Sequence, residues 1–272
     1  MKSIEPTSEQ TKMIEDAVAL HQSGQLDLAE IQYNKLLNYL PDNTLLLTNL
    51  GTIALQKGRL EDGVRIMGKS LKIDPNQPDA LNNRGVALRD LKRPDEALAS
   101  YERAIALKSD HAEAYSNRGV TLQDLNRPDE ALASYDRAIA IQPDYAEAYW
   151  NKSLLKILIG EYLEGWKLYE WRWKKESQIN SLRAYHQPLW LGDESIFHKT
   201  LLIYPEQGFG DYIQFIRYAA LAEQIGAKVI LEVPSELMTL CSTLKGQFTL
   251  IEKGKPLPNF DYHCPVMSLP LA

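Results

Sequence analysis

The feature that most constrains the fold of this chain is an internal repeat with a period of 34 residues. The segment that begins at Pro78 is followed, without a gap, by a closely similar segment that begins at Ala112. Periods of about 20 to 50 residues are typical of proteins built from stacked structural units. Weaker copies extend the register, so we expect five repeats over residues 10–175. They begin at Gln10, Thr44, Pro78, Ala112 and Ala146.

Each repeat carries small and bulky residues at fixed positions. Small residues occupy a first position at Ala17, Gly51, Gly85, Gly119 and Ser153, and a second at Ala29, Gly63, Ala97, Ala131 and Gly165. A bulky residue follows four positions later, at Tyr33, Met67, Tyr101, Tyr135 and Tyr169. Small residues let two helices approach closely, and the bulky side chain fills the space between neighbouring helix pairs. Each repeat is therefore predicted to be a helix, a short turn, a second helix and a stop.

This pattern resembles the tetratricopeptide repeat. The resemblance implies an α-solenoid in which five helical hairpins stack into a right-handed superhelix, because a single hairpin cannot bury its apolar face alone. The inner surface of such a superhelix is concave. We therefore expect a protein or an extended peptide as the partner in this groove.

The sixth residue of the repeats forms a row of asparagines on the predicted first helices, which line the inner wall. The residues are Glu15, Asn49, Asn83, Asn117 and Asn151. A carboxamide donates and accepts hydrogen bonds, so such a row can pair with the backbone of a peptide of any sequence. In the animal-type protein O-GlcNAc transferases, which this arrangement resembles, an asparagine ladder at this position holds the substrate polypeptide. The alternative is that the asparagines bond only to neighbouring hairpins.

Two further groups of repeat residues have an expected structural role. Arg84, Arg118 and Lys152 form a row beside the asparagines, where they pair with acids of adjacent helices or present charge to a partner. All five tryptophans lie between residues 150 and 190. Because a terminal repeat must cover an open apolar end, we expect Trp166, Trp171 and Trp173 to pack against the segment that follows.

Composition excludes several classes of function. The chain has 30 basic and 36 acidic residues, and acidic residues outnumber basic ones both in residues 1–175 and in residues 176–272. No nucleic-acid partner is therefore expected. No apolar run approaches the ~20 residues that span a bilayer, and the amino terminus lacks a signal-like apolar core, so a cytoplasmic protein without a membrane span is predicted. Cys241 and Cys264 are too few for a disulfide framework or a zinc site, and no metal site is predicted.

The rhythm of the sequence changes after residue 175. Residues 1–9 are expected to form a tail and 176–199 a connector, and residues 200–272 are expected to alternate short strands and helices. The predicted strands are 200–204, 228–233, 248–251 and 261–266, with helices over about 212–225 and from Pro234. This alternation predicts a parallel sheet wound by right-handed crossovers, which is a partial α/β Rossmann-like three-layer segment.

A glycine-containing turn follows the first of these strands. Gly208 and Gly210 allow a ligand to approach the backbone, at the edge of the sheet where ligands bind in such folds. The dinucleotide fingerprint G-x-G-x-x-G is not met, because residue 213 is Ile, so nicotinamide binding is disfavoured.

This second segment resembles a glycosyltransferase-like domain of GT-B architecture. The residues that carry the resemblance are PLWLGDE, TLLIYPEQGFGDYIQFIRYAALAEQIGAKVILEVPSELMTL and LPNFDYHCPVMSLPLA. Similar domains follow tetratricopeptide repeats in bacterial proteins related to the heptosyltransferases and, more distantly, to the protein O-GlcNAc transferases. The resemblance implies that Asp211 is a general base for the acceptor hydroxyl. The alternative is that Asp211 caps its helix.

Other residues of the same turn and helix are candidates for an acceptor pocket. They are Glu206, Gln207, Gly208, Gly210, Gln214 and Arg217. Arg217 is expected either to meet a negatively charged acceptor or to form a surface ion pair. His263 is expected to be a structural histidine.

Two functions from different classes remain open. About 70 residues follow the first strand, which is too few for a complete GT-B enzyme, so we expect a fragment of a longer protein. We expect no cofactor in this chain, and a nucleotide-sugar donor only in the complete enzyme. In the first function, the repeats present polypeptide acceptors to such an enzyme. In the second, the chain is a protein-protein interaction scaffold and the α/β segment only caps the superhelix. The incomplete sheet also suggests self-association through its free edge.

Overall fold

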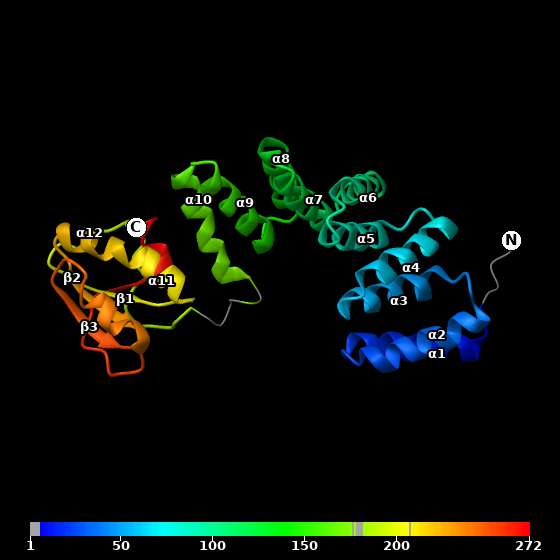
Figure 1. Cartoon of the computed structure of the whole chain (residues 1–272), viewed down its shortest axis with the longest axis horizontal. Coiled ribbons are helices and arrows are strands. Elements are labelled where there is room, and N and C mark those ends of the chain that lie inside the picture. The colour runs from blue at the N-terminus through cyan, green and yellow to red at the C-terminus, as the bar shows by residue number, and fades with distance from the viewer. Residues whose placement is uncertain (1–5, 176, 178–181, 207) are drawn as a thin grey trace. The chain divides into compact units, whose positions relative to one another are not determined.

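A computed structural model describes residues 6–175, 177, 182–206 and 208–272 of the chain (Figure 1). The chain divides into two compact units, Met1–Asn151 and Lys152–Ala272, and each is described here by itself. The division falls inside a helix of the last repeat, so the end of that repeat belongs to the same unit as the sheet.

Consecutive helical hairpins follow one another from the amino terminus through both units. The helices are α1 (Ser8–Gln22), α2 (Leu26–Tyr39), α3 (Thr44–Gln56), α4 (Leu60–Ile73), α5 (Pro78–Asp90), α6 (Pro94–Leu107), α7 (Ala112–Asp124), α8 (Pro128–Ile141), α9 (Ala146–Leu158) and α10 (Tyr162–Tyr169). Their bounds repeat every 34 residues from α3 onward, which confirms the predicted hairpins. The last second helix is shorter and continues as a 3-10 helix, η1 (Glu170–Lys174).

The turn inside each hairpin has the same backbone conformation. One residue in each turn has a positive φ between 57° and 88°. These residues are Gly24, Gly58, Lys92, Asn126 and Gly160. Glycine reaches this left-handed region without steric cost, whereas Lys92 does so at a cost of about 1 kcal/mol or more.

The small and bulky positions meet inside each hairpin. A Cβ atom built on Gly85 would lie 2.5 Å from the ring of Tyr101, and one on Gly119 would lie 2.6 Å from the ring of Tyr135. Both tyrosine side chains are fully buried. The glycines are therefore required because the tyrosine ring occupies the space of a side chain.

Within the first unit, first helices approach one another more closely than second helices do. Helix α5 contacts both α3 and α7 directly, in addition to its own hairpin partner α6. Closer spacing on one side of a stack makes that side the inner, concave one. The first helices therefore form the inner side of this unit, as the sequence predicts.

The second unit contains a four-stranded sheet in which all strands are parallel. Its strands are β1 (Thr200–Tyr204), β2 (Lys228–Val233), β3 (Phe248–Glu252) and β4 (Tyr262–Pro265), and their order in the sheet is β3-β2-β1-β4. All four predicted strands are confirmed to within one residue at each end. Runs of buried aliphatic residues in β1 and β2 explain this, because strands of a parallel sheet are covered on both faces.

The helices of this unit are shorter and more broken than the sequence suggests. They are α11 (Phe209–Phe215), η2 (Ile216–Tyr218), α12 (Ala219–Gln224), η3 (Ser235–Leu237), α13 (Met238–Cys241) and η4 (Val266–Ser268). The predicted helix over about 212–225 is thus two short α-helices joined by a 3-10 turn. No helix in the described part of the chain is both long and apolar enough to cross a bilayer.

Irregular segments cover part of the sheet. Leu202, Tyr204 and Ile230 form a buried cluster on one face, and Tyr185, Leu257 and Phe260 pack against it from loops rather than from a helix. The connector also bonds to the outer edge of β4, where the backbone N–H of Trp190 donates to the carbonyl of His263 over 2.9 Å. This bridge covers part of the β4 edge, and β3 is the other edge strand of the sheet.

Candidate functional site

The asparagine row lies on the inner side of the repeats. Asn49, Asn83, Asn117 and Asn151 occupy the same position on α3, α5, α7 and α9, and all four side chains are half-buried. The recorded contacts of this row run to the preceding hairpin, from Asn117 to Asn82 on α5 and from Asn49 to Tyr33 on α2. The carboxamides therefore lie at the boundary between the protein and its inner surface.

The members of this row differ in their hydrogen bonds. The Asn117 Nδ2 atom donates to the Oδ1 atom of Asn82, which is 1% exposed, over 3.1 Å. The predicted bond to a neighbouring hairpin is thus present at Asn117, although its partner is one residue away from the row. The Asn83 carboxamide has no hydrogen-bond partner among the described residues. Burial raises the pKa of Tyr33, and the nearby Asn49 side chain opposes this shift.

The row of cations beside the asparagines is engaged inside the hairpins. Arg84 donates to the Ser100 hydroxyl over 2.9 Å, and Arg118 donates to the Ser134 hydroxyl over 2.7 Å. In the last repeat, the Lys152 ammonium lies 3.4 Å from Glu164. These cations join the two helices of a hairpin, and Arg118 also lies 3.9 Å from Glu102 of the preceding hairpin, which is the expected pairing with an acid of an adjacent helix.

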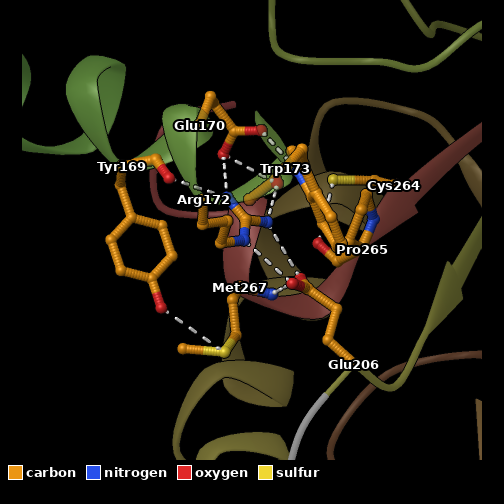
Figure 2. Close-up of polar contacts among 9 residues, drawn as sticks. Tyr169, Glu170, Arg172, Trp173, Glu206, Cys264, Pro265 and Met267 are labelled. Carbon is orange, nitrogen blue, oxygen red and sulfur yellow. Dashed lines mark hydrogen bonds and ion pairs between the residues drawn. The ribbon is translucent and has the colours of Figure 1, made fainter. Parts of the chain in front are cut away.

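At the carboxyl edge of the sheet, a buried arginine from the last repeat occupies the space between β1 and β4. Arg172 in η1 is fully buried, and its guanidinium binds Glu206 through two hydrogen bonds of 2.9 and 3.1 Å (Figure 2). Its other N–H groups donate to the Glu170 carboxylate at 2.6 Å, to the Ser268 hydroxyl at 2.7 Å and to the Tyr169 carbonyl at 3.4 Å. All five donors of the guanidinium are thus satisfied.

Glu206 is fixed by the same cluster. Burial raises the pKa of Glu206, and the positive charge of Arg172 opposes this rise. The backbone N–H of Met267 also donates to its carboxylate over 3.0 Å. Glu206 therefore binds the chain's own groups, at the edge where a ligand of a parallel sheet would be held. Gln207 lies outside the described residues.

The glycine turn leads directly into α11. Gly208 is the N-cap residue and Asp211 the third residue of that helix, with a half-buried side chain. Asp211 is thus not the N-cap, although its charge is well placed for the positive end of the helix. A Cβ atom built on Gly208 or Gly210 would meet no atom within 4 Å, so the chain's own packing does not require glycine at either position.

Gln214 and Arg217 lie elsewhere, at a pocket of about 670 Å³ within the second unit. They share it with aromatic and aliphatic residues of the last repeat and of the α/β segment, which are Ile157, Tyr162, Leu163, Trp166, Phe215, Tyr218, Pro270 and Leu271. The structure therefore brings Gln214 and Arg217 together, but Asp211 and Glu206 do not line this pocket.

Trp166 and His263 lie in structural positions, whereas the recorded contacts of Trp173 are with Glu170 and Arg172 of its own segment. The rings of Trp166 and Phe215 meet edge-to-face with centroids 5.6 Å apart, so Trp166 joins the last repeat to the α/β segment, as expected. His263 is 4% exposed, and burial lowers the pKa of its imidazole. Arg172 and Ser268 were not singled out by the sequence, since nothing local distinguishes them from surface residues.

Family comparison identifies the repeats. The tetratricopeptide-repeat family matches residues 76–144 through one of its models and residues 46–77 through another. Residues 46–144 are tetratricopeptide repeats. These matches span less than half of the chain, and neither is to a glycosyltransferase. A search of curated proteins gives no match.

Solved structures with similar folds are also repeat proteins. MamA is 25% identical, with a TM-score of 0.53 over 61% of this chain and 97% of MamA. PilW, described as a widely conserved type IV pilus biogenesis factor, is 20% identical, with a TM-score of 0.58 over 65% of this chain and 80% of PilW. YrrB, described as a TPR protein with an unusual peptide-binding site, is 21% identical, with a TM-score of 0.50 over 61% of this chain and 85% of YrrB.

Proposed function

We propose that this chain binds extended polypeptides along the inner side of its tetratricopeptide repeats. The observation that carries the proposal is the Asn83 carboxamide, which is half-buried on the inner first helices and has no hydrogen-bond partner among the described residues. A carboxamide that makes no hydrogen bond within the chain is available to a ligand, and a peptide backbone offers it both a donor and an acceptor.

The neighbouring asparagines extend this arrangement. Asn117 uses its Nδ2 atom to bind Asn82, which leaves the carbonyl oxygen of its side chain to accept from a peptide N–H. Recognition through backbone groups is independent of peptide sequence, so the partner is defined by an extended conformation. The description of YrrB as a peptide-binding repeat protein supports this class of ligand.

A permanently unfolded protein is a suitable probe for such binding. We expect the full chain to bind reduced and carboxymethylated α-lactalbumin, and to bind folded α-lactalbumin much more weakly. Asn83→Ala is expected to weaken this binding at least fivefold without lowering the melting temperature, because no hydrogen bond within the chain is lost. Asn76→Ala, in an exposed loop of the same unit, is the matched control. Equal affinity of the Asn83→Ala and Asn76→Ala variants would contradict the proposal.

Glycosyl transfer to the bound polypeptide is the second candidate function. The strand order β3-β2-β1-β4 is that of the first four strands of a doubly wound Rossmann-like sheet, which supports the resemblance to a GT-B half-domain. Asp211 would act there as the general base, and the nucleotide-sugar donor would be bound by a second domain. Arg172 binds Glu206 and Ser268, which follow β1 and β4, so an acceptor would approach from the side of Gly208 and Gly210.

The test of this candidate is the Asp211→Asn variant of a complete enzyme. A base at this position predicts a loss of turnover of at least a hundredfold with an unchanged melting temperature. Full activity of the variant would contradict the role of Asp211 as a general base. Its favourable interaction with the amino-terminal end of α11 would then be its remaining role.

A further inference from the structure

The fifth hairpin differs from the other four at two positions next to its turn. The last residue of the first helix is polar in four hairpins and leucine in the fifth, and the second residue of the second helix is acidic in four and leucine in the fifth. The first set is Gln22, Gln56, Asp90, Asp124 and Leu158, and the second set is Asp27, Glu61, Asp95, Asp129 and Leu163. The first four hairpins thus show that a hairpin of this kind folds with polar or acidic residues at these two positions.

Neither leucine is explained by folding of the hairpin. Leu158 is 72% exposed and Leu163 is 69% exposed, and Tyr162 between them is 61% exposed. An acid in the first turn of a helix interacts favourably with the helix dipole; α10 keeps one such acid, Glu164, but Leu163 replaces the acid of the other hairpins and places an apolar side chain in water. An exposed group of large apolar residues of this kind marks a contact surface.

Two of these residues, Tyr162 and Leu163, border a groove within the second unit. Tyr162 and Leu163 line both the pocket of about 670 Å³ and an adjoining hollow of about 580 Å³ at the hairpin turn. Trp166 and Phe215 form the floor where α10 meets α11, and Tyr218 follows on η2. We name this surface, from Tyr162 and Leu163 to Tyr218, the α10 groove; the exposed Leu158 precedes it at the hairpin turn.

The charges around the α10 groove restrict its occupant. Arg217 is the only charged residue of the larger pocket, and among the described residues its guanidinium contacts the Tyr218 ring at 5.2 Å and no carboxylate. Glu161 and Glu164 at the hairpin turn are paired with Lys156. Lys167 lines the adjoining hollow and, like Arg217, has no carboxylate partner among the described residues. These two cations favour carboxylates on the occupant.

We propose that the α10 groove binds a polypeptide segment that carries large apolar side chains and a carboxylate. The apolar side chains pack on Tyr162, Leu163 and Trp166, and the carboxylate pairs with Arg217. Two of the side chains that line the groove, Tyr162 and Leu163, are more than 60% exposed, so a segment of chain covers it better than a small enclosed molecule does. This surface is separate from the asparagine row, and its occupant is a different partner.

The experiment is a selection of peptides from a random twelve-residue display library on the full chain, followed by anisotropy measurements with the synthetic peptides. We expect selected peptides to contain large apolar residues together with Asp or Glu. The double variant Leu158→Asp/Leu163→Asp carries the residues that the third and fourth hairpins have, so it is expected to fold with an unchanged melting temperature and to bind at least tenfold more weakly. Leu221→Asp, at a 53% exposed leucine of α12 outside the groove, is the matched control.

Charge pairing is tested separately with Arg217→Gln. This variant is expected to bind the acidic peptides more weakly. Its affinity for peptides with Asn or Gln in place of the acid should be unchanged. Asn83→Ala should not change peptide binding at the α10 groove, which distinguishes this site from the inner side of the repeats. Selection of basic peptides, or equal binding by the double leucine variant, would overturn the proposal. So would leucine-dependent binding to phosphatidylglycerol vesicles, or leucine-dependent self-association in sedimentation.

Discussion

Arg172 and Glu206 form a bidentate ion pair that joins the last helical repeat to the loop after the first strand of the sheet. The side chain of Arg172 is fully buried and that of Glu206 is 3% exposed. Burial lowers the pKa of Arg172, and the carboxylates of Glu206 and Glu170 reverse this and raise it overall. The last repeat and the sheet are thus joined through a charged contact as well as through Trp166 and Phe215.

Removal of one member of this pair is predicted to destabilise the second unit strongly. Arg172→Ala leaves the buried Glu206 carboxylate without its partner, which costs about 3–5 kcal/mol. The double variant Arg172→Met/Glu206→Leu removes both charges and should cost much less. Urea denaturation followed by tryptophan fluorescence reports on this unit, because Trp166, Trp171, Trp173 and Trp190 lie in it. An Arg172→Ala midpoint equal to that of the parent would show that the contact does not hold the unit together.

The hairpin turns provide a second prediction. Lys92 has a φ of 61° at a position where three of the five hairpins have glycine. Lys92→Gly is expected to stabilise the first unit by about 0.5–1 kcal/mol, since relief of the left-handed strain exceeds the extra entropy of glycine in the unfolded chain. Thermal denaturation followed by circular dichroism measures the effect. Asn126→Gly is the matched comparison. Its free energy of unfolding should rise by less, because asparagine tolerates this conformation. A loss of stability in Lys92→Gly would contradict the assigned turn geometry.

Buried tyrosines predict how stability depends on alkaline pH. Burial raises the pKa of Tyr101 and of Tyr135 above the ordinary value of 10.0. Above about pH 10 the unfolded chain releases these protons and the folded chain retains them, so the free energy of unfolding should fall as the pH rises. Below pH 10 both states keep the protons and no such dependence is expected.

The matched variant for this prediction is Tyr101→Phe. The Tyr101 hydroxyl has no hydrogen-bond partner among the described residues, so its removal should cost little at neutral pH. It should also make the loss of stability above pH 10 less steep. Denaturant titrations from pH 8 to pH 11 provide the measurement. An unchanged slope in the variant would mean that Tyr101 ionises normally in the folded protein.

Local and periodic features of the fold were predictable from the sequence. The pairing of Gly85 with Tyr101 follows from a small and a bulky residue at fixed repeat positions, and the strands β1 and β2 follow from short runs of buried aliphatic residues. The predicted helix over about 212–225 is interrupted at Ile216–Tyr218, where tertiary packing overrides a continuous helical pattern.

The candidate site was less predictable, because it depends on contacts between distant residues. Arg172 and Glu206 belong to segments that the sequence assigns to different domains. No sequence pattern around either residue predicts that the two side chains form a pair. Asn117 binds Asn82 rather than a member of the predicted row, since the choice depends on the rotation of one helix against the next. Leu158 and Leu163 depart from the repeat pattern in the sequence, but their exposure is known only from the structure.

The central claim is that the inner asparagines bind polypeptide backbone, and their side-chain NH₂ resonances test it most directly. In ¹H–¹⁵N spectra of the full chain, addition of carboxymethylated α-lactalbumin is expected to shift the Asn83 and Asn117 side-chain signals and to slow exchange of their NH₂ protons with water. Asn76 in the same unit should not respond. Binding of the probe with no change in the Asn83 and Asn117 signals would contradict the account.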